Sequence, residues 1–236
     1  MNPGEVFFIR LFALLGICAA PLDIVFILTI GALRPKYNGI TSFASLLGVP
    51  GTPYAMLISG WWFLYGFMLI LFAVGLLFSM PRDSRVRWIG PLLIMIFGIF
   101  DGIGSAVFPC DPGCAGLTIA GKMHVLVSAV GTAALVPAPF FCWLGWRQDR
   151  RFEKILTFSW IVQIAGLLLL VILLFARLKG VADYLNGFGG LIQRLVYTVY
   201  YLWLVPVGVT MYRLAGAEMS GGGAPNEPNS KVTFTH

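Results

Sequence analysis

Residues 54–79 read YAMLISGWWFLYGFMLILFAVGLLFS, an apolar run without a single charged side chain. A helix needs about 20 apolar residues to cross the hydrocarbon core of a bilayer, so this run is long enough to span a membrane. Comparable runs recur along the chain. They lie at about 11–31, 54–79, 88–108, 123–146, 155–176 and 191–212. The sequence therefore predicts an all-α polytopic membrane protein, a bundle of six transmembrane helices.

The overall composition excludes an ordinary soluble domain. Hydrophobic residues make up 58% of the 236 residues and charged residues only 11%, whereas a soluble domain carries about 25% charged residues. The six spans and their loops fill residues 1–215, which leaves no room for a separate soluble domain. Residues 216–236 are rich in Gly, Ser, Pro and Asn, and we expect a disordered cytoplasmic tail there.

The net charge of +6 is concentrated in two connecting loops. The basic residues of these loops are Arg82, Arg85 and Arg87 after the second span, and Arg147, Arg150, Arg151 and Lys154 after the fourth. Loops rich in Arg and Lys usually face the cytoplasm. We therefore expect a protein of the bacterial inner membrane, surrounded by membrane lipids, with both termini in the cytoplasm. A charge distribution of this kind does not indicate a partner nucleic acid.

Polar side chains interrupt the apolar spans at one level of the bilayer. With the amino terminus inside, the outer half contains Asp23, Asp101, His124, Gln193 and Arg194, on four different helices. A charged side chain near the bilayer centre costs roughly 2.5–3.5 kcal/mol on insertion scales, and such side chains usually face a protein interior or a cavity. We therefore predict that these five side chains converge on one outward-opening pocket.

Each of these residues has an expected chemical role and a structural alternative. Asp101, Asp23 and His124 are the catalytic candidates, because a carboxyl group in an apolar pocket can serve as a proton donor. Gln193 and Arg194 are the ligand-binding candidates, with Arg194 as the counter-charge. In the structural alternative Asp23 caps or bridges a helix kink or pairs with Arg194, and Asp101 belongs to an ion pair. His124 then lies at the headgroup level, and Arg194 is an anchor that snorkels to the membrane surface.

Cys110 and Cys114 flank Asp-Pro-Gly in the expected outer loop. The turn allows a disulfide between them and an oxidising compartment permits one, but the sequence leaves both the bonded and the free state open. Their spacing is not that of a redox Cys-x-x-Cys motif. The chain has two histidines, one of them the terminal His236, and no spacing typical of a zinc site. We expect no metal and no cofactor, since no phosphate-binding loop or other catalytic motif occurs either.

Three short motifs stand out in the loops and at the span ends. They are Arg-Pro-Lys-Tyr-Asn-Gly at 34–39, Phe-Pro-Cys-Asp-Pro-Gly at 108–113 with Gly-Lys-Met-His at 121–124, and Gly-Leu-Ile-Gln-Arg at 190–194. Together they resemble a widespread family of six-span prokaryotic membrane proteins that is classed only as a domain of unknown function. The resemblance covers roughly residues 10–215 and implies the six-span architecture. It strengthens Asp111, His124 and Arg194 as site candidates, and Tyr37 and Asp111 join the ligand-binding set. It implies no activity.

The first functional hypothesis is that the protein binds or handles a small amphiphile, a lipid or an isoprenoid, in this pocket. The second is a membrane-embedded isomerase or cyclase that uses an intramembrane aspartate as general acid. The third is a structural or assembly subunit, with another membrane protein or a second copy of the chain as partner, whose polar groups serve only helix packing. Whether the protein is an enzyme stays open at this point.

Overall fold

Six helices are long and apolar enough to cross a membrane in the computed structural model, which describes residues 2–175 and 186–221. The helical elements are α1 (Pro3–Leu33), η1 (Ala44–Gly48), α2 (Ala55–Ser79), α3 (Ile89–Phe97), η2 (Gly98–Gly104), α4 (Ser105–Val107), η3 (Pro112–Cys114), α5 (Ile119–Leu135), α6 (Ala138–Trp146), η4 (Arg150–Phe152), α7 (Glu153–Phe175), η5 (Asn186–Phe188) and α9 (Gly189–Gly221). No strand occurs among the described residues. The predicted all-α, six-helix membrane fold is confirmed.

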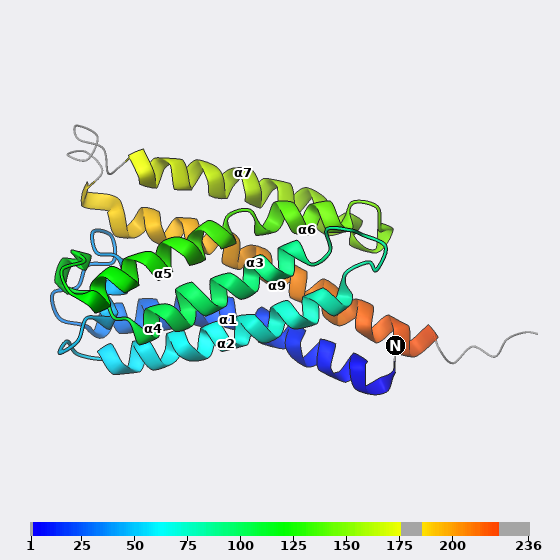
Figure 1. The fold of residues 1–236 in the computed structure, drawn as a ribbon, viewed down its shortest axis with the longest axis horizontal. Coiled ribbons are helices and arrows are strands. Elements are labelled where there is room, and N and C mark those ends of the chain that lie inside the picture. Colours follow the sequence, from blue (N-terminus) through cyan, green and yellow to red (C-terminus); the bar gives the residue numbers. More distant parts are fainter. Residues whose placement is uncertain (1, 176–185, 222–236) are drawn as a thin grey trace, which may run out of the picture.

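The six spans form one bundle in which neighbouring spans run in opposite directions (Figure 1). The helix α1 packs on α2 and α9, and α9 also packs on α7. The third span, Ile89–Val107, consists of α3, η2 and α4 and packs on α2 and α5. Loops 34–54 and 108–118 lie at one end of the bundle, which we call the disulfide end. The other end, which we call the basic end, contains loops 80–88 and 147–152 and both described chain ends.

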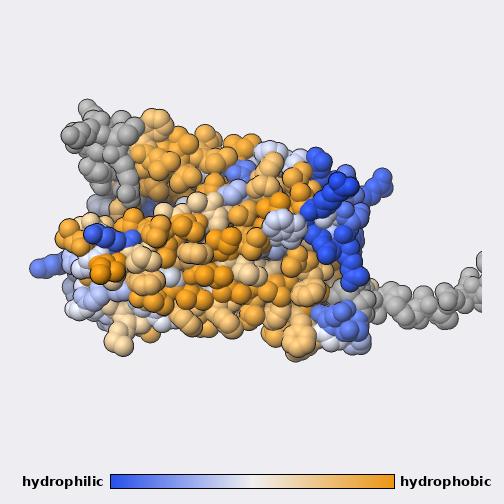
Figure 2. Space-filling model, in the orientation of Figure 1, coloured by the Kyte–Doolittle hydropathy of each residue, from blue (hydrophilic) through white to orange (hydrophobic). Residues whose placement is uncertain are grey.

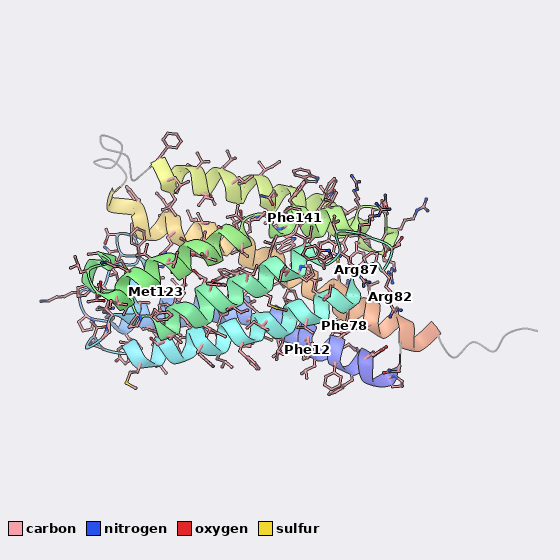
Figure 3. The ribbon with its side chains drawn as sticks, viewed as in Figure 1. Phe12, Phe78, Arg82, Arg87, Met123 and Phe141 are labelled. Carbon is pink, nitrogen blue, oxygen red and sulfur yellow. A yellow bond between two sulfur atoms is a disulfide. The ribbon has the colours of Figure 1, made fainter. Side chains whose placement is uncertain are left out.

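The surface of the bundle carries a wide apolar belt between two more polar ends (Figure 2). The basic end is the more strongly hydrophilic of the two in this view. Arg82 and Arg87 lie there, while Met123 lies close to the disulfide end (Figure 3). Lipid tails cover an apolar belt of this kind, and charged side chains mark where it ends.

Two helices extend beyond the predicted spans. The first begins at Pro3 rather than near residue 11, because the Asn2 side chain caps it and the Glu5 carboxylate accepts a bond from the Asn2 backbone. The last continues to Gly221, past residue 216, where we expected the tail to begin. The two extensions support each other, since Val6 and Ile9 bury against Ala215. The rest of the predicted tail lies outside the described residues.

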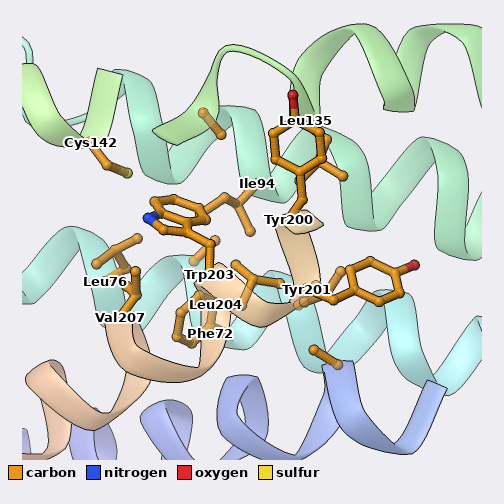
Figure 4. Packing of buried hydrophobic residues seen from close by; sticks show 14 of the residues in the cluster. Phe72, Leu76, Ile94, Leu135, Cys142, Tyr200, Tyr201, Trp203, Leu204 and Val207 are labelled. Atoms are coloured by element: carbon orange, nitrogen blue, oxygen red, sulfur yellow. The ribbon is translucent and has the colours of Figure 1, made fainter. Parts of the chain in front are cut away.

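The core at mid-bundle is built on large aromatic side chains from the last span (Figure 4). Trp203 is completely buried among side chains from several helices, and its Nε1 donates a hydrogen bond of 2.9 Å to Ser159 Oγ on α7. Phe72 of α2 and Ile94 of α3 belong to the same cluster. This buried layer fixes the position of α9, which carries much of the candidate site.

The third span is drawn close to α2 by glycines. A methyl group added to Gly102 would lie 2.6 Å from the Gly66 Cα, so the two backbones are in direct contact there. Gly98 faces the same part of α2. The span is α-helical up to Phe97 and then continues as a π-helix through Gly98–Gly104. Small residues permit such an approach of helices, and it positions Asp101, the one charged residue of this segment.

Candidate functional site

A cavity of about 1100 Å³ lies in the half of the bundle toward the disulfide end. Residues of α1, α2, η2, α5, α7 and α9 line it. The structure brings all five of the polar residues that topology placed at one level to this cavity: Asp23, Asp101, His124, Gln193 and Arg194. The five residues that were predicted to share one pocket therefore line one cavity, while their roles remain predictions.

Two carboxyls on different spans line the cavity, a buried one on Asp23 and a half-buried one on Asp101. Asp23 of α1 is 1% exposed, and its Oδ1 accepts a hydrogen bond of 2.8 Å from the indole of Trp61. Asp101 of η2 accepts a hydrogen bond of 3.3 Å from the Tyr197 hydroxyl, which also bonds to Thr132 at 2.8 Å. Both aspartates thus have neutral hydrogen-bond partners, and no ion pair to either occurs among the described residues.

The backbone around Asp101 is unusual in two ways. It lies in the π-helical turn, and such turns occur frequently at functional sites. On the facing helix α5, a side chain at Gly131 would come within 2.7 Å of the Asp101 backbone nitrogen. The wide turn and the missing side chain together give the carboxyl its place at the cavity wall.

Arg194 does not act as a counter-charge to the aspartates. Its Nη1 donates to the carbonyls of Gly39, Ser42 and Gly190 at 2.7, 2.9 and 2.9 Å, and its Nη2 donates to the Tyr37 hydroxyl. The predicted pairing with Asp23, and the role as counter-charge, are corrected by these contacts. The reason is that the first loop folds over the start of α9 and presents its carbonyl oxygens to the guanidinium.

Tyr37, a predicted ligand-binding residue, belongs to this loop and does not line the cavity. Its hydroxyl bonds to the carbonyls of Ser42 and Phe43 at 3.3 and 3.1 Å. Burial raises the pKa of the Tyr37 phenol, although the neighbouring Arg194 opposes this. The phenol therefore stays protonated at neutral pH and supports the fold of the loop.

Gln193 and His124 line the cavity, and a backbone contact holds each of them. The Gln193 side chain accepts a hydrogen bond of 2.9 Å from the backbone nitrogen of Ala44, which ties η1 to α9. The Nδ1 of His124 lies 2.9 Å from the carbonyl oxygen of Phe108. These bonds fix the orientation of both side chains next to the cavity.

Cys110 and Cys114 form a disulfide, with their Cα atoms 5.2 Å apart. Cys114 lines the cavity, and its sulfur lies 3.2 Å from Ser45 Oγ. The two sulfurs and a ring nitrogen of His124 lie within 4.8 Å of one another. In the bonded state neither sulfur is a thiolate, so this group does not provide the ligands that a zinc site needs.

Asp111, the other predicted ligand-binding residue, lies outside the cavity lining. Its carboxylate accepts hydrogen bonds from the Leu117 nitrogen, the Thr118 nitrogen and the Thr118 hydroxyl at 2.7, 2.9 and 2.7 Å. The bonds from Thr118 and Leu117 lower the pKa of this carboxyl. Gly121 packs directly against it. The spacing between Asp111 and Gly121 is thus explained by the fold of the loop.

Sequence reasoning missed the aromatic residues of the site. Tyr65, Tyr197 and Tyr201 line the cavity next to the two aspartates. The sequence did carry a signal for Tyr197 and Tyr201, because they follow Arg194 at the spacing of one helix face. The sequence carried no such signal for Tyr65, because it lies on α2 and only the packing of α2 against the third span brings it to the cavity.

The fold and the cavity define a polytopic α-helical membrane protein with a cavity at one end of its bundle, lined by apolar side chains and a few polar ones. The chain belongs to the family described as "Protein of unknown function (DUF998)", whose model matches residues 17–210. The match contains every residue of the cavity discussed above, and the predicted membership of a six-span family of unknown function is confirmed. No curated protein and no solved structure matches the chain.

Proposed function

We propose that this protein binds or handles a small amphiphile, such as a lipid or an isoprenoid, in its cavity. The observation that carries the proposal is the combination of chemistries in one space. Asp23 and Asp101 lie at its polar wall, while Leu170, Leu173 and Leu174 of α7 supply an apolar wall. A volume of about 1100 Å³ is slightly above the range for small-molecule sites, about 300–1,000 Å³.

Access from the bilayer supports the same proposal. Leu28, Val125, Leu174, Leu191 and Leu195 line the cavity and are also exposed on the outside of the bundle. Exposed apolar side chains at this depth face lipid tails. An amphiphile can therefore enter sideways, with its tail between these apolar side chains and its head toward the aspartates.

Native mass spectrometry of the protein released from nanodiscs tests the proposal. We expect one non-bulk lipid per chain on the wild type, and its loss in Asp101→Asn. Asp83→Asn is the matched control, because Asp83 is exposed in the loop between α2 and α3 and its substitution makes the same charge change away from the cavity. Bare protein in the wild type and in both variants would contradict the proposal.

The second candidate function is an isomerase or cyclase of such a lipid with Asp101 as general acid. One observation favours it: the chain of hydrogen bonds from Thr132 through Tyr197 to Asp101 can position a proton. Turnover of the lipid identified by mass spectrometry, abolished in Asp101→Asn with binding retained, would establish it. Tight binding without turnover would leave the binding role alone.

We further infer that the protein resides in a bacterial inner membrane with the basic end in the cytoplasm. The arginines of loops 80–88 and 147–152, and Lys154 at the start of α7, support this orientation. Reporter fusions after Gly221 that are active only in the cytoplasm test it. Should the polar residues serve packing alone, as in an assembly subunit, a membrane-protein partner or a second copy would co-purify in fixed ratio and Asp101→Asn would retain it.

A further inference from the structure

We propose that the amphiphile bound in the cavity carries a cationic amine head, held by Asp23 and Asp101 within a group of aromatic rings. This inference rests on the proposed function and names the class of ligand. It is based on the two carboxyls and the aromatic rings at one wall of the cavity, where no basic side chain among the described residues pairs with Asp23 or Asp101.

No basic side chain among the described residues supplies a counter-charge to Asp23 or Asp101. Arg194 is the one Arg or Lys among the described residues that line the cavity, and its guanidinium is bonded to loop carbonyls and to Tyr37. His124 is bonded to the Phe108 carbonyl. Asp23 is buried and Asp101 is half-buried, and an ionised carboxylate in such surroundings is unfavourable unless a cation pairs with it or it takes up a proton. A ligand with an ammonium head supplies the charge that the chain does not.

The second argument is the free acceptor on Asp101. The Tyr197 hydroxyl bonds to Oδ1 of this carboxyl, and Oδ2 receives no hydrogen bond from the described residues. An ammonium group carries several donors and no acceptor, so it fits an oxygen that lacks a donor. A hydroxyl head could make one such bond but would leave the charge uncompensated.

The third argument is the aromatic environment. Tyr65 and Tyr201 have ring centroids 5.7 Å apart, Tyr197 and Tyr201 6.0 Å, and Phe97 lies within 6.1 to 6.4 Å of these three rings. The faces of aromatic rings attract ammonium groups, and aromatic cages are used to recognise them. An anionic head would meet the carboxyls of Asp23 and Asp101 at this wall, which repel it when they are ionised.

The test compares three probes with the same chain and different heads: octylamine, octanol and octanoate. Each is titrated at pH 7 into the protein in phosphatidylcholine nanodiscs, and its binding is followed by native mass spectrometry and by the shift in Tm. At this pH an alkylamine is charged and a carboxylate is ionised. We expect octylamine to bind the wild type at least about tenfold more tightly than the other two, since only it forms the ion pair.

Variants connect the preference to the carboxyls. In Asp101→Asn the advantage of octylamine should fall by about tenfold, whereas in the control Asp83→Asn it should be unchanged. The wild-type series by itself keeps the proposal testable if Asp101→Asn does not fold. Octanol or octanoate binding as tightly as octylamine would overturn the amine head and leave the amphiphile cavity intact. No binding of any probe, with no co-purified lipid, would overturn both.

Discussion

Arg194 joins two parts of the chain that are 155 residues apart, α9 and the first loop. Its planar group donates to three carbonyls and one phenol, a geometry that the single nitrogen of lysine cannot reproduce. We therefore expect Arg194→Lys to lower the free energy of unfolding by about 2 kcal/mol, as for lost bonds to a charged group. Thermal unfolding in detergent measures this loss. Arg213→Lys, at an exposed position of the same helix, is the control and should leave Tm unchanged.

The hydrogen bonds of Asp111 predict how the stability of the protein depends on pH. Its folded-state pKa lies below the ordinary value of 3.8, because Thr118 and Leu117 donate to the carboxylate. The resulting stabilisation is complete above pH 3.8 and is lost as the pH falls through the lower, folded-state value. Asp111→Asn should thus unfold at a lower temperature than wild type at pH 7, and the difference should shrink below about pH 4. A difference that stays constant from pH 7 to pH 3 would contradict this account.

At the scale of elements, the contact between α2 and the third span depends on Gly66. A side chain there would collide with the Gly98 carbonyl and lie 2.8 Å from the Ile103 nitrogen. We expect Gly66→Ala to separate the two helices and to cost about 1–3 kcal/mol, as overpacking does. Gly60, also on α2, has nothing within 4 Å of its would-be side chain. Gly60→Ala should therefore be neutral or stabilising in the same thermal assay, because alanine favours a helix over glycine.

The elements also show what the sequence could and could not predict. The six spans follow from apolar length alone, since only a helix of that length satisfies its backbone inside a bilayer. The π-helical turn around Asp101 was not predictable, because it depends on how closely Gly66 of another helix approaches. The extension of α1 to Pro3 depends on the cap formed by Asn2 and Glu5, which the sequence carries, and on the contact of Val6 and Ile9 with Ala215, which it does not reveal.

For the candidate site, helix direction was sufficient to bring Asp23, Asp101 and His124 to one level of the bundle. It did not reveal which partner each polar group has. Arg194 binds carbonyls and Asp111 binds amides, and both kinds of partner belong to loops whose path no residue pattern specifies. Depth in the membrane was thus predictable from topology, whereas pairing required the folded loops.

At the scale of the whole molecule, the orientation depends on the basic end. Replacing Arg82, Arg85 and Arg87 by glutamine removes the positive charge of one of its two loops. Because Lys and Arg in short loops set the direction of insertion, we expect a mixed population with some chains inverted. Reporter activity on both sides of the membrane from fusions after Gly221 would show it. The same replacement of Arg34 and Lys36, at the disulfide end, is the control and should leave one orientation.

The pairing of α1 with α9 has a consequence for how the protein is made. Domains are synthesised from the amino terminus, so α1 enters the membrane long before its neighbour α9 exists. Until then the Arg194 guanidinium cannot bind the carbonyls of the first loop, and the cavity lacks the wall that α9 provides. In a nascent chain stopped after α7, Asp23 would have its bond to Trp61 of α2 but not the cover of α9. An unfinished chain would therefore differ from a completed one in that uncovered carboxyl.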